Sequence, residues 1–106
     1  MANDKILSMI GLATKAGKIV SGEFSTEQSV KRGRAVMVMI SSDASENTKK
    51  KFTNMCSFYK VPLYVYGTRE SLGRAAGKEF RVSLAIQDEG FSKAIMKLID
   101  PENQRR

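Results

Sequence analysis

Two glycine-bearing turns bring together residue types that suit contact with nucleic acid. The first turn, K-A-G-K-I-V-S-G-E-F-S, places Gly22 directly before a polar segment that is compatible with a helix. Unpaired backbone N–H groups at a helix start, together with the helix dipole, attract a phosphate or an acceptor on a base edge. Lys15 and Lys18 are expected to flank this turn and to add positive charge. An ordinary solvated helix is the alternative interpretation.

More cations follow one helix length later. Lys31, Arg32 and Arg34 would surround the polar helix with positive charge, which favours binding of a polyanion through the release of its counterions. Phe24 stands beside the expected helix start, among lysines. Its ring could stack on an unpaired base, or it could pack on the core as a hydrophobic staple.

The second turn, L-G-R-A-A-G-K-E-F-R-V, places an aromatic side chain between two cations. Phe80 lies between Lys78 and Arg81, ahead of an apolar run. This arrangement suits an extruded base and the phosphates beside it. Because large apolar side chains are usually buried, Phe80 could instead belong to the core. A third basic run, the lysines 49–51, is expected to form a solvated helix face, with weak phosphate contact as the alternative.

Catalysis and metal binding have few candidate residues. Cys56 is the single cysteine and the sequence has no histidine, so the usual zinc ligands and the general base of most hydrolases are missing. Cys56 lies on an apolar helical stripe and is expected to be an inert core residue. Asp88 and Glu89 could cap a following helix or bind a metal, and the capping role is the simpler one. We therefore expect no catalytic residue, no metal and no cofactor.

Helical and strand-like patterns alternate along the chain and would position these turns. Apolar residues recur at helical spacing in several segments, whereas residues 35–40 are continuously apolar, as in a strand buried on both faces. Asp43 and Glu46 have the spacing of a capping box, and Thr68 is a further N-cap candidate. Pro101 would end the last helix before a charged tail. The predicted helices cover residues 4–14, 25–32, 43–59, 68–77 and 91–99, and the predicted strands cover residues 18–20, 35–40, 63–66 and 82–86.

Length and charge limit the class of protein further. The 106 residues suit one domain, with an ordered core at about 4–100 and a tail at 101–106, and they can form a core without disulfides. The 18 basic and 11 acidic residues give a net charge of +7, which points to a polyanion as partner. Because no stretch has the length of a membrane span or the core of a signal peptide, we expect a soluble, cytoplasmic protein.

The order of these segments resembles a known superfamily. The chain is similar to the kink-turn-binding ribosomal proteins of the archaeal type called L-seven-Ae, and most closely to their small bacterial relatives of the YlxQ type. The similarity runs from about Lys5 to Leu98 and rests on K-A-G-K-I-V-S-G, V-K-R-G, K-V-P-L-Y-V-Y and L-G-R-A-A-G-K-E-F-R-V-S-L-A-I. It implies a three-layer α/β/α sandwich with a small mixed sheet. It also implies that the turn at Gly22 and the loop from Lys78 to Val82 lie side by side and bind RNA.

The resemblance includes a departure at the first turn. RNA-binding members of the family have G-x-N-E-x-x-K there, in which Asn and Glu contact tandem sheared G·A pairs and Lys meets the RNA. This chain keeps Gly22 but has Phe24, Ser25 and Gln28 at those three positions. Ser25 is shorter than Glu and neutral, so strict kink-turn readout should be weaker by about 1–3 kcal/mol for each lost contact.

The sequence therefore predicts a non-enzymatic, monomeric RNA-binding protein that associates with the ribosome or another structured RNA through shape and phosphate contacts. The resemblance implies that Phe80 and Val82 pack on an extruded nucleotide, with Lys78 and Arg81 as phosphate partners. A protein-interaction module that keeps this fold but has lost specific RNA readout is the alternative. The predicted RNA-binding residues are Lys15, Lys18, Gly22, Phe24, Ser25, Gln28, Lys31, Arg32, Lys78, Phe80, Arg81 and Val82.

Overall fold

The computed structural model describes residues 4–99, in which helices and strands alternate as predicted. The elements are α1 (Lys5–Lys15), β1 (Ile19–Ser21), α2 (Glu23–Lys31), β2 (Met37–Ile40), α3 (Glu46–Tyr59), β3 (Leu63–Val65), α4 (Arg69–Ala75), β4 (Ser83–Ile86) and α5 (Glu89–Ile99). The predicted helix stop at Pro101 and the charged tail at 101–106 lie outside the described residues.

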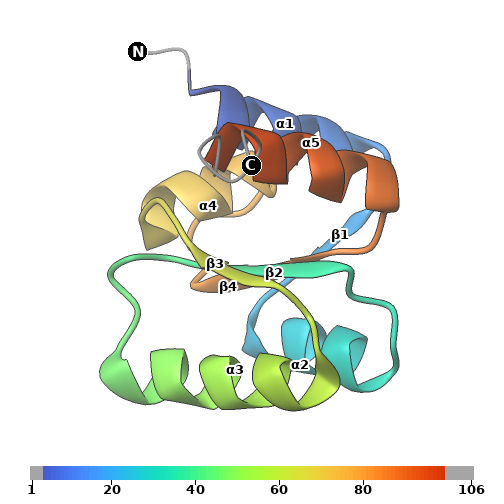
Figure 1. The fold of residues 1–106 in the computed structure, drawn as a ribbon. Helices are drawn as coiled ribbons and strands as arrows, with labels where there is room; N and C mark the ends of the chain where they lie inside the picture. The colour runs from blue at the N-terminus through green and yellow to red at the C-terminus, as the bar shows by residue number, and fades with distance from the viewer. Residues whose placement is uncertain (1–3, 100–106) are drawn as a thin grey trace.

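The four strands form one mixed sheet in the order β1-β4-β2-β3. Strands β2 and β3 are parallel, whereas β4 is antiparallel to both of its neighbours, β1 and β2. Helices α1, α4 and α5 cover one face of the sheet, and α2 and α3 cover the other (Figure 1). The predicted three-layer α/β/α sandwich with a small mixed sheet is confirmed.

The sheet has two ends that differ in which residues they carry. Strands β1, β2 and β3 run in the same direction and β4 runs against them. The end where β1, β2 and β3 begin and β4 finishes is called here the amino end, and the opposite end is called the carboxyl end. Figure 1 shows the chain entering β1, β2 and β3 together on the right, at the amino end.

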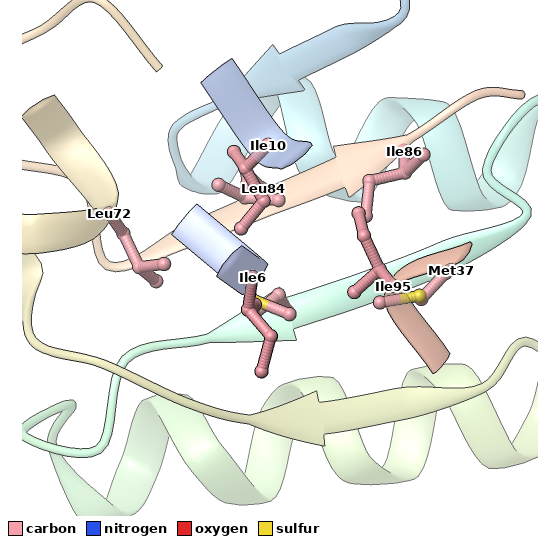
Figure 2. Close-up of a cluster of buried hydrophobic side chains, with 8 residues drawn as sticks. Ile6, Ile10, Met37, Leu72, Leu84, Ile86 and Ile95 are labelled. Carbon is pink, nitrogen blue, oxygen red and sulfur yellow. The ribbon is translucent and has the colours of Figure 1, made fainter. Parts of the chain in front are cut away.

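Apolar side chains from both faces of the sheet form the core. All four residues of β2 are buried, and because successive strand residues point to opposite faces, they contribute to both layers. Met37 and Met39 join the cluster under α1 and α5, whose members are drawn in Figure 2. Val38 and Ile40 join the cluster against α2 and α3, together with the fully buried Phe52.

Side-chain caps fix the starts of four helices. Asp4 accepts a hydrogen bond from the Leu7 amide at 2.9 Å at the start of α1. Thr68 forms a capping box with Ser71 at the start of α4, which confirms the predicted cap. Asp88 accepts from the Phe91 amide at 2.9 Å, so its predicted capping role is confirmed as well.

The predicted capping box of Asp43 and Glu46 is wrong. Ser45 is the N-cap of α3, and its hydroxyl oxygen accepts from the Thr48 amide at 3.1 Å. The carboxylate of Asp43 instead accepts from the backbone N–H and the guanidinium of Arg69, at 3.1 and 3.4 Å. This contact across 26 residues takes Asp43 away from the helix start.

Candidate nucleic-acid interface

Gly22 forms the sharp turn between β1 and α2 at the carboxyl end of the sheet. Its φ of 97° lies in the region that favours glycine. The Gly22 N–H donates to the carbonyl of Ser83 at 2.9 Å, so the turn is tied to the beginning of β4. Gly22 is also the N-cap of α2, which therefore starts at Glu23, two residues earlier than predicted.

Helix α2 starts without a side-chain cap. Within residues 4–99, the other four helices each have an Asp, Ser or Thr side chain that accepts from a first-turn amide. Gly22 has no side chain that could do so. Because first-turn amides have no acceptor within the helix, they can donate to a ligand here.

The loop at residues 78–82 lies directly beside this turn. The Arg81 guanidinium donates through Nε to the hydroxyl of Ser21 at 2.9 Å and through Nη1 to the carbonyl of Phe80 at 2.8 Å. The Arg81 backbone N–H donates to the carbonyl of Arg69 at 2.9 Å. The predicted proximity of the two segments is confirmed, and residues 22–28 together with residues 78–82 are called here the two-loop site.

Gly73 in α4 allows the loop to pass this close. A Cβ atom at Gly73 would lie 2.6 Å from the carbonyl oxygen of Glu79 and 2.8 Å from the Cα of Phe80. The N–H of Lys78 donates to the carbonyl of Gly73 at 2.7 Å. This role of Gly73 is not visible in the sequence, because the contact depends on how the loop returns across its own helix.

Both aromatic rings of the two-loop site are exposed. Phe24 has 74% of its surface exposed and Phe80 has 48%, so the staple role for Phe24 and the core role for Phe80 are wrong. Phe24 lies on the side of α2 next to β1, an edge strand, where no further layer of the described residues covers it. Val82 is half-buried and packs against the core cluster below the sheet.

A groove runs along α2 beside the edge strand. Phe24, Gln28 and Arg32 repeat at four-residue spacing and therefore share one side of the helix. The groove has a volume of about 230 Å³, and Gln87 closes it by donating from Nε2 to the hydroxyl of Ser29 at 2.8 Å. The residues lining this α2 groove are Val20, Phe24, Ser25, Gln28, Ser29, Arg32, Arg34 and Gln87.

Four residues of the groove were not among the predicted site residues: Val20, Ser29, Arg34 and Gln87. Val20 lies in β1, and Gln87 directly follows β4. Ser29 lies in α2, one turn after Ser25. The polar character of Ser29 was visible in the sequence. The pairing of β1 with β4, which brings Val20 and Gln87 beside α2, was not.

The side of α2 next to α3 carries a network of four charges. The Lys51 ammonium from α3 lies 2.8 Å from the carboxylate of Glu23 and 2.9 Å from that of Glu27, and Lys31 lies 2.8 Å from Glu27. Hydrogen bonds from Lys31 and then from Lys51 lower the pKa of the Glu27 carboxyl to about 2. The hydrogen bonds to Glu23 and Glu27 raise the pKa of Lys51. The expected solvated face at residues 49–51 is therefore wrong for Lys51, and Lys31 is held on the α3 side of α2.

Lys15 and Lys18 do not flank the Gly22 turn. Lys18 precedes β1 and Gly22 follows it, so the two residues lie at opposite ends of the sheet. A strand of three residues separates them by about 10 Å. The Lys18 carbonyl accepts from the N–H of Gln87 at 2.8 Å, which places Lys18 at the amino end. This prediction is wrong because the strand lies between the cations and the glycine.

Cys56 is a core residue, as predicted. It is 2% exposed, and burial raises the pKa of its thiol to about 11, so the reactive thiolate is disfavoured. Among residues 4–99, no three His, Cys, Asp or Glu side chains are arranged to hold a metal ion. The same stretch of chain has no helix with the length and apolar character needed to cross a membrane.

Comparison with known proteins places these features in a family. The model of the "Ribosomal protein L7Ae/L30e/S12e/Gadd45 family" matches residues 4–96. The RNA-binding protein YlxQ of Bacillus subtilis is 44% identical over 92 residues, which cover 87% of this chain and 92% of that protein. The large ribosomal subunit protein eL30 of Methanothermobacter thermautotrophicus is 34% identical over 85 residues, which cover 78% and 87%.

Solved structures agree with this relationship. A Bacillus halodurans protein of unknown function has a TM-score of 0.87 at 43% sequence identity, with 91% of this chain and 97% of that chain covered. A 15.5kD RNA-binding protein of Giardia lamblia shares the fold, with a TM-score of 0.76 at 20% identity and with 95% and 90% of the two chains covered. The family model and the relatives confirm the resemblance in the sequence, and the chain belongs to the ribosomal protein L7Ae/L30e/S12e/Gadd45 family.

Proposed function

We propose that this protein binds structured RNA at the two-loop site and does so without catalysing a reaction. The observation that carries the proposal is the uncapped start of α2 beside the loop at residues 78–82, with the exposed rings of Phe24 and Phe80 at the same place. The names of its relatives support the same conclusion, since they are RNA-binding and ribosomal proteins.

Each part of the two-loop site has a distinct role in this proposal. The free amides at the start of α2 donate to a phosphate or a base edge, while Phe24 and Phe80 stack on unpaired bases. Lys78 is exposed and neutralises a phosphate. Arg81 keeps the loop beside Ser21 through Nε, while Nη1 donates to the Phe80 carbonyl within the loop. Its positive charge attracts the RNA backbone.

The recognition relies on shape more than on a base code. Ser25 and Gln28 are neutral, so neither supplies the charge-assisted hydrogen bond that a Glu or a Lys would make. Kink-turn RNA remains a suitable ligand, with weaker discrimination at the tandem G·A pairs. Beyond the RNA itself, we propose a ribosomal or other ribonucleoprotein partner, a monomeric protein and a cytoplasmic location.

A salt titration with a kink-turn hairpin tests this function. If about three phosphates are neutralised, the affinity should fall roughly 20- to 40-fold between about 50 and 200 mM salt, because each contact releases condensed counterions. The affinity is measured by fluorescence anisotropy. An affinity that does not change with salt would contradict the electrostatic basis of the proposal.

RNase treatment distinguishes the alternative function. A protein-interaction module would keep its partners in a pull-down from an RNase-treated lysate. The proposed RNA binder should release them, because the RNA holds the complex together.

A further inference from the structure

Five exposed cations gather at the amino end of the sheet, away from the two-loop site. They come from the end of α1 and from the connections that lead into β1, β2 and β3, which the strand directions place together. The cations that form this group are Lys15, Lys18, Arg32, Arg34 and Lys60.

Backbone hydrogen bonds fix these connections beside one another. Gln87 donates from its N–H to the carbonyl of Lys18, and its side chain lines the α2 groove with Arg32 and Arg34. Lys60 ends α3, and two residues later the carbonyl of Pro62 accepts from β2 at 2.9 Å. Neighbouring strands lie about 4.8 Å apart, so the group spans the width of the sheet, about 15 Å.

Among the described residues, no carboxylate lies close enough to form an ion pair with this group. Across residues 4–99, none of the five cations forms an ion pair, in contrast to Lys31 and Lys51 on the other side of α2. The acidic residues that follow β4 are engaged elsewhere: Asp88 caps α5 and Glu89 lies 4.0 Å from Lys93.

We propose that the amino end is a second RNA-contact surface, which takes the phosphate backbone of a segment separate from the one held at the two-loop site. The inference rests on the proposed RNA-binding function and extends it to another part of the molecule. Unpaired cations spread over about 15 Å match a chain of phosphates, and binding is favoured because each neutralised phosphate releases counterions. The α2 groove connects the two surfaces, since it runs from Phe24 to Arg34.

Charge reversal with a matched control tests the proposal. The test variant combines Lys18→Glu, Arg34→Glu and Lys60→Glu. The control combines Lys5→Glu, Lys93→Glu and Lys97→Glu on the exposed faces of α1 and α5. Each set changes the net charge by six, from +7 to +1, so any effect of overall charge is the same in both.

The probe is a fluorescent oligouridine of about 12 nucleotides, because a backbone contact does not depend on sequence. We expect the test variant to bind at least about 10-fold more weakly and the control no more than about 3-fold more weakly, with the salt slope reduced by about two in the test variant alone. Equal losses in both variants would overturn the proposal and leave this surface to a different class of partner.

The unmodified protein provides a second measurement that does not depend on how the variants fold. On addition of oligouridine, the backbone amide NMR signals of Lys18, Arg34 and Lys60 should shift together with those of the two-loop site. Shifts confined to residues 22–28 and 78–82 would overturn the second surface while supporting the first. Shifts confined to the amino end would support the second surface, and the salt titration with the kink-turn hairpin tests the two-loop site separately.

Discussion

The two sides of α2 differ in how their polar residues are used. On the side next to α3, Glu23, Glu27, Lys31 and Lys51 satisfy one another's charges at 2.8–2.9 Å. On the side next to β1, Phe24 and the groove residues have no such partner helix within the described residues 4–99, and the aromatic ring is largely exposed. A single short helix therefore has one side that is held by the protein and one side that is open.

This difference explains how a helix with little apolar surface can present the proposed RNA-binding site. Val30 is buried and anchors α2 to the core. The ion pairs with Lys51 join α2 to α3 and hold the carboxylates of Glu23 and Glu27 toward α3. The open side thus has a lower density of negative charge, which favours the approach of RNA.

The largest expected effect comes from Gly73→Ala. This substitution would disturb the loop at residues 78–82 beside the open side of α2. It would leave intact the side next to α3, called here the paired side because its charges form ion pairs. The new Cβ would lie 2.6 Å from the carbonyl oxygen of Glu79, so the loop backbone must move. We expect a loss of about 1–3 kcal/mol in the free energy of unfolding, together with at least a tenfold loss of RNA affinity.

Gly11→Ala provides the control for this substitution. Its Cβ would meet the carbonyl oxygen of Ala75 at 3.8 Å, which is an ordinary contact, and alanine is the better helix former by up to about 1 kcal/mol. Denaturant unfolding and RNA binding are measured for both variants. Equal stability of the two variants would contradict the assigned role of Gly73.

Phe24→Ala tests the open side alone. Phe24 is 74% exposed, so the free energy of unfolding should change by no more than about 0.5 kcal/mol. RNA affinity should fall by about 1–3 kcal/mol, the usual contribution of a stacked base. Phe58→Ala is the matched control, because Phe58 is 76% exposed but lies on α3. Similar losses of affinity in both variants would show that the stacking residue is assigned wrongly.

Lys51→Met tests the paired side. Because the partners are partly exposed, we expect a loss of only about 0.5–1 kcal/mol in the free energy of unfolding. Without its partner, the Glu23 carboxylate next to Gly22 would repel RNA, and affinity should fall about threefold. Adding Glu23→Gln to Lys51→Met should restore the affinity, as a double-mutant cycle can measure. A cycle without coupling would mean that Lys51 does not act through Glu23.

The smallest effect concerns pH and again involves the paired side. The folded protein holds the pKa of Glu27 at about 2, below the ordinary value of 4.5. Between these two pH values the Glu27 carboxyl is protonated in the unfolded chain but ionised in the folded protein. The contribution of Glu27 to the free energy of unfolding is therefore fully present above about pH 4.5 and is lost as the pH falls toward 2. Denaturant unfolding at several pH values should show a shallower decline for Glu27→Gln. Parallel curves would contradict the lowered pKa.

Local sequence patterns were sufficient to predict the alternation of helices and strands. The continuous apolar run at residues 35–40 identified the central strand because both of its faces are buried. Local patterns were ambiguous for the cap of α3, since Asp43 and Ser45 both stand ahead of a helical stripe. The choice between them depends on Arg69, which is 26 residues away from Asp43.

The candidate site was harder to predict than the fold, because its parts meet only through the sheet. Arg81 and Ser21 are 60 residues apart yet hydrogen-bonded, and only the family resemblance predicted that their segments are neighbours. Lys18 was assigned to the Gly22 turn because it is close in sequence. The strand β1 lies between Lys18 and Gly22 and places them at opposite ends of the sheet, which local composition does not show. The exposure of Phe24 likewise depends on β1 being the edge strand of the sheet.

The uncapped start of α2 also links ligand occupancy to local order. A first turn without an acceptor for its amides frays more readily than one that is closed by a carboxylate or a hydroxyl. An RNA acceptor at Gly22 would complete that turn, so hydrogen exchange at Phe24 and Ser25 should slow in the complex. In the proposed complex, the RNA would therefore supply the hydrogen-bond acceptor that α2 lacks at its start.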